Sequence, residues 1–213
     1  MKSSDTISEY STSSTISAAM EQRIQNELTR VEQAHGVKVL YACESGSRGW
    51  GFASQDSDYN VRFIYAHPAD WYLAVCPEKQ RDVLESGIVS TPDGVLDCSG
   101  WDVRKALRLL QKFNGALPEW LTSPIVYRKQ GSFADRALSA ATQGFSPLTL
   151  WHHYRSIRNK SLERFQTKQT AKVWLYAFRP MLAMLWIERG LGIPPTPFEI
   201  LVRELLSPQE QAE

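Results

Sequence analysis

The chain contains 213 residues, of which 43% are hydrophobic and 22% are charged, and its formal net charge is +1. Such proportions are ordinary for a soluble globular protein, and this length allows one domain, or one core with a helical extension. The nearly balanced charge argues against binding of nucleic acid through overall electrostatic attraction. Only a local basic face could bind nucleic acid in this way.

The cysteines and the hydropathy pattern argue against further classes of protein. Cys43, Cys76 and Cys98 lack the CxxC spacing of a zinc site, and their odd number favours a reducing cytoplasm. No apolar run reaches about 18 residues, and no charged segment leads into an apolar one at the start. We therefore expect neither a membrane span nor a secretory signal.

The first part of the chain is predicted to contain a tail and a helix. Residues 1–16 are rich in Ser and Thr and are typical of a disordered tail. Residues 17–35 are predicted to form a helix that ends at Gly36, a residue suited to a C-cap. The apolar residues of this helix recur at helical spacing: Met20, Ile24, Leu28 and Val31.

Two predicted strands, Val37–Cys43 and Asp58–Tyr65, flank a stretch of small residues that contains Gly46-Ser47. A Gly-Ser pair after a strand can open a short helix, whose free N–H groups and serine hydroxyl then face an anion. Carboxylates two residues apart on a strand edge suit Mg²⁺, which prefers oxygen ligands. The pattern therefore indicates a phosphate and metal site. Because side chains alternate along a strand, one face of the second strand is polar: Asp58, Asn60 and Arg62.

The connection over residues 48–57 contains two residues with open alternatives. Arg48 could reach a phosphate through its planar guanidinium, or it could pair with Asp56 or Asp58 in a structural role. Trp50 could stack on a base, or it could pack beneath the loop, which is the commoner role for an aromatic residue there.

The middle of the chain is predicted to add strands and a helix. Two short strands, 83–90 and 95–98, are predicted around a turn at Pro92-Asp93-Gly94. The segment 102–112 has the apolar stripe and basic face of an amphipathic helix. Lys105 on that basic face is either solvated or helps to hold a triphosphate or an RNA backbone.

From about residue 131 the pattern changes to helices, which divides the chain into a predicted core over 17–130 and a helical region over 131–213. Pro180 is expected to kink or break one of these helices, and Thr196-Pro197 is expected to cap and open the last one. The sequence thus predicts an α+β (α/β) fold, in which a small mixed sheet is flanked by helices and followed by a helical region.

Gly46-Ser47, followed by Asp58-Tyr59-Asn60-Val61, resembles the signature of the DNA polymerase β-type nucleotidyltransferases. The longer strings around these residues are similar to one subfamily, the predicted nucleotidyltransferases of bacteria and phages, some of which are encoded beside RNA-ligase and polynucleotide-kinase genes. Further similar segments extend the resemblance over roughly residues 20–206: Ser99–Asp102, Glu119–Leu121 and Ser123–Tyr127.

The resemblance implies transfer of a nucleoside monophosphate from a nucleoside triphosphate to a hydroxyl group, with two Mg²⁺ (or Mn²⁺) ions. The implied acceptor is an RNA or tRNA end, or a protein. Asp58 and position 60 correspond to the first two metal ligands. The third ligand, or general base, is Asp97 on a hydrophobic-Asp-hydrophobic strand, or else Asp102, for which helix capping is the simpler explanation.

The resemblance also implies which residues contact the nucleotide. In related enzymes a helical part covers the nucleotide, and here its candidates by position are Lys160, Lys172, Tyr176 and Arg179. The candidate ligands of the nucleotide or its phosphates in the predicted core are Gly46, Ser47, Arg48, Arg62 and Lys105.

One departure from the family pattern affects function. The family has an acid where this chain has Asn60, which carries no charge and is a poorer ligand for Mg²⁺. We therefore expect weaker metal binding and an activity that is reduced or lost. The alternative function is that of a catalytically dead relative that binds a nucleotide or a partner, as a regulatory or antitoxin-like module.

Overall fold

The computed structural model describes residues 16–54, 57–73, 75, 81–84 and 95–212. Most of the predicted tail, the predicted turn at Pro92-Asp93-Gly94 and most of the predicted strand over 83–90 lie outside the described residues. Within the described part of the chain, no helix has both the length and the apolar character needed to cross a membrane.

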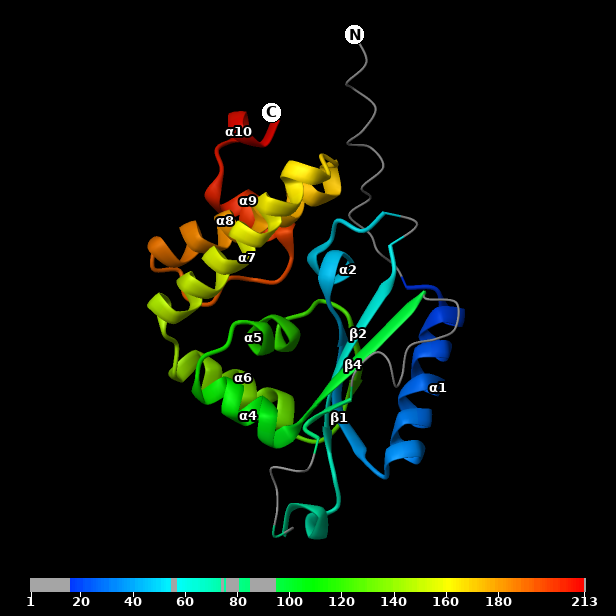
Figure 1. The fold of residues 1–213 in the computed structure, drawn as a ribbon. Helices are drawn as coiled ribbons and strands as arrows, with labels where there is room; N and C mark the ends of the chain where they lie inside the picture. Colours follow the sequence, from blue (N-terminus) through cyan, green and yellow to red (C-terminus); the bar gives the residue numbers. More distant parts are fainter. Residues whose placement is uncertain (1–15, 55–56, 74, 76–80, 85–94, 213) are drawn as a thin grey trace.

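A mixed β-sheet lies at the centre of the described structure, as predicted for the α+β class (Figure 1). Its strands are β1 (Lys38–Glu44), β2 (Tyr59–Ala66), β3 (Val83–Leu84), β4 (Leu96–Asp102) and β5 (Val126–Lys129). Their order across the sheet is β3-β4-β2-β1-β5. β2 runs parallel to β4 and antiparallel to β1, while β3 and β5 pair antiparallel with β4 and β1.

Helices cover both faces of this sheet, because each face carries apolar side chains (Figure 1). α1 (Ala18–His35) packs on one face through its buried apolar stripe. Its ends match the prediction, since the Ser17 side chain caps the first turn and Gly36 adopts the left-handed C-cap conformation. The other face is covered by α4 (Val103–Gln111), α5 (Ala116–Leu121) and α6 (Phe133–Gln143).

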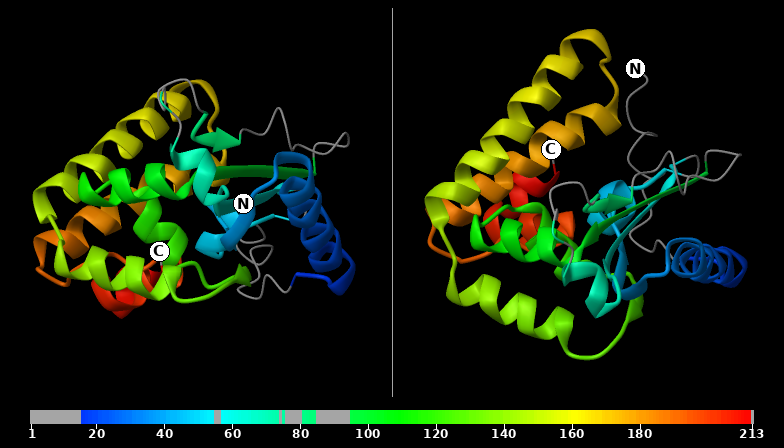
Figure 2. Two further views of the ribbon diagram at one scale, coloured as in Figure 1. Left: turned by 90° about the horizontal axis from the view of Figure 1, so that it is seen from below. Right: turned by 60° about the horizontal axis from the view of Figure 1, so that its bottom comes forward.

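The last part of the chain forms helices that pack on one another (Figure 2). α7 (Pro147–Thr167) and α8 (Ala171–Glu188) lie side by side, and α9 (Phe198–Leu205) packs against α8. α6 belongs to the predicted helical region, but it packs on the sheet. The division at residue 130 therefore stays a prediction. Three short helices complete the described structure: α2 (Gly46–Trp50), η1 (Ala69–Leu73) and α10 (Pro208–Ala212).

Three local predictions differ from the structure. Residues 126–129, for which sequence analysis predicted no strand, form the edge strand β5. α8 continues through Pro180, so the predicted alternative of a break is wrong and that of a kink stays a prediction; both halves of the helix bury apolar side chains, which offsets the lost hydrogen bond. The last long helix begins at Phe198 with Pro197 as its cap, while Thr196 is buried against α5.

A buried ion pair joins the helical part to the sheet. Arg179 on α8 is 1% exposed, and its guanidinium donates to Glu119 Oε1 on α5 at 2.7 Å. The Tyr154 hydroxyl donates to the same oxygen at 3.0 Å, and Arg179 also donates to the Thr196 carbonyl at 3.1 Å. The guanidinium stacks 4.5 Å from the centre of the Trp50 ring. Arg179, a candidate for contacting the nucleotide, therefore fixes α7 and α8 against the sheet.

We predict that Glu119→Gln lowers the free energy of unfolding by about 3–5 kcal/mol, because the Arg179 charge is left buried without its carboxylate. The control is Glu204→Gln, which breaks an exposed pair with Arg203 and is expected to change stability by less than about 0.5 kcal/mol. Urea unfolding followed by circular dichroism measures both. Equally small losses in the two variants would contradict the role of the buried pair.

Candidate functional site

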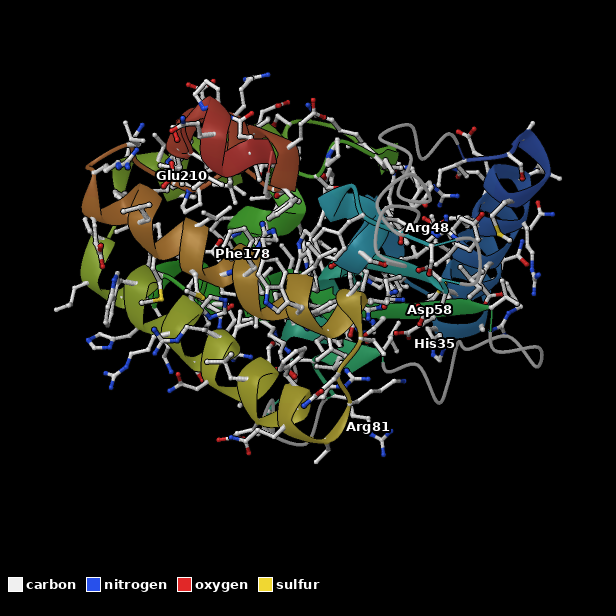
Figure 3. All side chains as sticks on the ribbon, turned by 90° about the horizontal axis from the view of Figure 1, so that it is seen from above. His35, Arg48, Asp58, Arg81, Phe178 and Glu210 are labelled. Carbon is white, nitrogen blue, oxygen red and sulfur yellow. The ribbon has the colours of Figure 1, made fainter. Side chains whose placement is uncertain are left out.

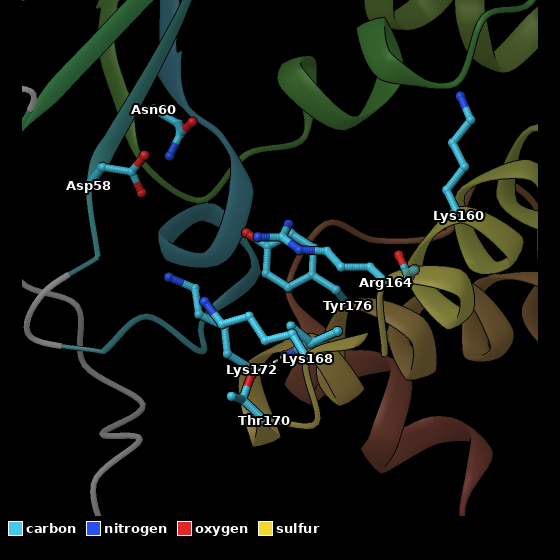
Figure 4. Close-up of a pocket in the computed structure, with 10 residues that line it drawn as sticks. Asp58, Asn60, Lys160, Arg164, Lys168, Thr170, Lys172 and Tyr176 are labelled. Carbon is cyan, nitrogen blue, oxygen red and sulfur yellow. Dashed lines mark hydrogen bonds between the residues drawn. The ribbon is translucent and has the colours of Figure 1, made fainter. Parts of the chain in front are cut away.

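The predicted metal-site residues meet at the end of the sheet where the inner strands β2 and β4 begin, which is called the strand edge below. The register of this parallel pair sets Asn60 beside Asp97. Asp58 lies just before β2, and Figure 4 shows its carboxylate on the same side of the strand as the Asn60 amide. β1 ends at this edge and leads into α2. The fold therefore brings Asp58, Asn60 and Asp97 into one region.

Of the two acidic candidates for the third position, only Asp97 lies at this edge. Asp102 lies at the opposite end of β4, where its buried carboxylate accepts the Arg104 backbone N–H at 2.8 Å and caps α4. Lys105 on α4 pairs with Asp82 at 3.3 Å. Because α4 starts where β4 ends, the structure does not bring Lys105 to the candidate site.

Arg62, predicted as a phosphate ligand, turns instead toward its neighbours on the strands. One terminal nitrogen donates to Asp97 Oδ2 at 2.8 Å and to Asn60 Oδ1 at 3.2 Å. The other donates to the backbone carbonyls of Val61 and Asp97, both at 3.2 Å. The guanidinium therefore lies between two of the three predicted metal ligands.

Gly46 and Ser47 form the first turn of α2. Gly46 has φ +63°, a left-handed conformation that favours glycine, and an added Cβ would lie 3.5 Å from the Asn60 amide nitrogen. Ser47 is 1% exposed, and Tyr176 from α8 packs nearby against the rings of Trp50 and Phe52. This turn is thus held between β2 and the helical part of the chain.

Arg48 and Trp50 both contact other parts of the fold. Arg48 donates to the backbone carbonyls of Ser57 at 2.5 Å and Asp58 at 3.3 Å rather than to the Asp58 carboxylate, while Asp56 lies outside the described residues. Its guanidinium also lies 4.0 Å from the centre of the Tyr59 ring. Arg48 and Asp58 are labelled at this end of the molecule in Figure 3. Trp50 packs against Tyr176 of α8, so α2 contacts the helical part of the chain.

A cavity of about 430 Å³ lies between this edge of the sheet and the helical part. Asp58 and Asn60 line one side of it, and α7, α8 and the link between them line the other. Figure 4 shows the side chains of Arg164, Lys168 and Lys172 extending from the helical part toward the ribbon that carries Asp58 and Asn60, while the Lys160 side chain points away from them. The basic residues that line the cavity are Lys160, Arg164, Lys168 and Lys172.

Most of these cations lack a partner within the described part of the chain. Lys172 donates to Ser57 Oγ at 3.0 Å. The side chains of Lys160, Arg164 and Lys168 form no hydrogen bond or ion pair with another described residue. Several unpaired positive charges around one cavity repel one another, so the arrangement favours a ligand with several negative charges.

Sequence analysis selected Lys160, Lys172 and Tyr176 as residues of the helical part that contact the nucleotide, and all three line the cavity. It did not select Arg164 and Lys168. A signal was present, because Lys160 and Arg164 are four apart and therefore share one face of α7, and Lys168 follows as its C-cap.

Glu44, at the end of β1, is a further group that sequence analysis did not select. Its carboxylate is buried and accepts the Tyr127 hydroxyl at 2.6 Å and the Asn60 backbone N–H at 2.8 Å. Burial raises the pKa of Glu44 to about 7, and these two hydrogen bonds only partly oppose the effect. Glu44 thus holds β1, β2 and β5 together next to Asn60.

The donor set at this edge consists of two carboxylates and one amide. Within the described residues, no group of three or more His, Cys, Asp or Glu side chains is placed to hold a metal ion. Asp58, however, is exposed at the cavity, and its carboxylate accepts no hydrogen bond from the described residues. These residues therefore fit a hard cation at Asp58 whose other ligands are water or substrate oxygens.

The raised pKa of Glu44 predicts a specific pH dependence of stability. Between its ordinary pKa of 4.5 and its folded value of about 7, the folded state binds this proton more tightly than the unfolded state. The contribution of Glu44 to stability is therefore fully present below pH 4.5 and lost as the pH rises to about 7. We predict that this loss reaches at most roughly 3 kcal/mol.

The measurement compares the unfolding free energy of the unmodified chain with that of Glu44→Gln, by urea unfolding with EDTA present. The unmodified chain should lose stability relative to the variant across this pH window, because only its residue 44 can ionise. A difference between the two chains that does not change with pH would contradict the buried, proton-binding state of Glu44.

Comparisons with known proteins place this chain in a family. The crystal structure of a nucleotidyltransferase-like protein from Exiguobacterium sibiricum 255-15 shares 12% identity with it, at a TM-score of 0.37. That match covers 86% of this chain and 62% of the other, so this chain spans less than two thirds of that protein's length. An uncharacterized protein of Bacillus subtilis (strain 168), YcgL, is 44% identical over 197 residues, which are 91% of this chain and 74% of the relative. Residues 20–213 match the sequence model of the RNA repair pathway DNA polymerase beta family, and the chain therefore belongs to this family of polymerase β-type nucleotidyltransferases.

Proposed function

We propose that this chain binds a nucleoside triphosphate in the cavity and transfers its nucleoside monophosphate to a hydroxyl group of an RNA or tRNA end, or of a protein. One observation carries the proposal: four basic residues of the helical part line the same cavity of about 430 Å³ as Asp58 and Asn60. A triphosphate carries several negative charges, and hydrogen bonds from Lys and Arg to phosphate are among the strongest in proteins.

In this proposal the helical part and α2 hold the nucleotide. Arg164 and the three lysines bind the triphosphate, while the Gly46-Ser47 turn lies close to Asn60 and supplies backbone N–H groups. Their positive charge stabilises the negative charge that shifts toward the departing pyrophosphate. The residues act mainly by positioning, since phosphoryl chemistry of this type needs little covalent help from the protein.

The acidic residues act on the other side of the reacting phosphate. Asp58 would hold Mg²⁺ or Mn²⁺, which supplies charge neutralisation when it is bound. Asp97 would accept the proton of the attacking hydroxyl; its Oδ1 is buried and accepts no hydrogen bond within the described part of the chain. Arg62 holds the other oxygen of Asp97 and so orients the carboxylate.

Asn60 reduces this activity or abolishes it. It stands at a position where the family has an acid, and its amide oxygen already accepts a hydrogen bond from Arg62. The same observation supports the second candidate, a relative that binds nucleotide through the basic cavity without transferring it. The two functions share the cavity and differ only in the transfer step.

We predict that Asn60→Asp increases nucleotide transfer at least ~10²-fold over the unmodified chain, because it restores a preorganised charge at the reacting phosphate. Asp58→Ala should show no transfer. Each chain is incubated with labelled ATP, CTP, GTP or UTP, Mg²⁺ or Mn²⁺ and total RNA, and covalent label is counted. Absence of transfer by the unmodified chain and by Asn60→Asp, together with saturable nucleotide binding, would favour the binding-only function.

We also predict that Arg164→Gln weakens binding of a non-hydrolysable nucleoside triphosphate by about tenfold to a hundredfold, as expected for the loss of one charged hydrogen-bond donor. The matched control is Arg158→Gln on the same helix, whose side chain bonds to Asn159 outside the cavity. Isothermal titration calorimetry measures both. Equal affinities for the two variants would contradict binding in this cavity.

A further inference from the structure

Arg62 places a positive charge inside the group of predicted metal ligands. Its guanidinium is 2.8 Å from Asp97 Oδ2 and 3.2 Å from Asn60 Oδ1, and so joins the side chains of two paired strands. The guanidinium also donates hydrogen bonds to two backbone carbonyls, those of Val61 and Asp97. The Arg62 side chain is only 19% exposed. Its position is therefore set by the sheet rather than by solvent.

Among the three side chains that these hydrogen bonds join, the charges already balance. Asp97 contributes one negative charge, Arg62 contributes one positive charge, and Asn60 contributes none. A divalent ion that bridged residue 60 and Asp97 would lie beside the guanidinium and would be repelled by it. It would also take Asp97 Oδ2 from Arg62, which would leave a largely buried guanidinium without its carboxylate.

An acid at position 60 would change this balance, because two carboxylates could then serve both the guanidinium and an ion. With Asn60, only one carboxylate is present between the strands. Asp58 differs from Asp97 in its surroundings and in its hydrogen bonds. It is exposed at the cavity, and its carboxylate accepts no hydrogen bond from the described residues, whereas the Asp97 carboxylate accepts one from Arg62. Asp58 therefore keeps its charge available for an ion.

We propose that Arg62 serves as a fixed cation between Asn60 and Asp97, so that this chain binds one divalent ion, at Asp58, and excludes a second. The part of this inference that concerns the nucleotide complex rests on the proposed function. The exclusion by Arg62 does not, because it follows from contacts of the protein alone.

The test counts bound Mn²⁺ by electron paramagnetic resonance, with and without a non-hydrolysable nucleoside triphosphate. The unmodified chain should bind one protein-held Mn²⁺, and Arg62→Gln should bind one more under the same conditions. Arg158→Gln, which removes an arginine outside the cavity, should match the unmodified chain. Two ions on the unmodified chain, or the same number on Arg62→Gln, would overturn the proposal.

A second variant keeps the test decisive if Arg62→Gln does not fold, as judged by circular dichroism. Asn60→Asp adds a carboxylate without removing Arg62, and it should also gain one Mn²⁺; an unchanged count would overturn the proposal. Nucleotide binding is measured in the same samples. Its absence would contradict the proposed function, while the difference in Mn²⁺ count between the chains would still decide the role of Arg62.

Discussion

The parallel pairing of β2 with β4 is the constraint on which the candidate site depends. Its register sets Asn60 beside Asp97, and the same strand start carries Asp58. A shift of one residue in this pairing would turn Asp97 to the other face of the sheet, because strand side chains alternate. Buried apolar residues on both faces oppose such a shift, so the core of the sheet fixes the chemistry at its edge.

The helical part supplies the charge that the strands lack. Asp58 and Asn60 line a cavity whose opposite side carries four basic residues, and these come from elements far along the chain. The buried pair of Arg179 with Glu119 keeps those elements against the sheet. One helix, α8, therefore carries both a residue that stabilises the fold and a residue of the proposed binding site. Arg179 is buried, and Lys172 lines the cavity. Loss of the pair would therefore affect the position of the cations as well as stability.

Local patterns in the sequence predict the part of the site that lies on the strands, but not the basic residues of the helical part that lie opposite it. The Gly46-Ser47 turn and the polar face of β2 follow from small residues and strand alternation, which act over a few residues. Arg164 and Lys168 do not follow, because a basic helix face looks the same in sequence whether it meets solvent or a cavity. Lys105 was predicted to contact the nucleotide, but it lies away from the candidate site. The reason is topological: Lys105 follows β4, whereas the site lies where β4 begins. β5 is short and follows Pro124 closely, so its pairing with β1 leaves little local signal.

The central claim is that a nucleoside triphosphate lies between the strand edge and the basic side chains of α7 and α8. A crystal structure of the chain with Mn²⁺ and a non-hydrolysable nucleoside triphosphate tests it most directly, with anomalous scattering used to locate the metal. The account predicts a triphosphate in contact with Arg164 and Lys172, and one Mn²⁺ at Asp58. A nucleotide bound elsewhere, with this cavity unchanged, would contradict it.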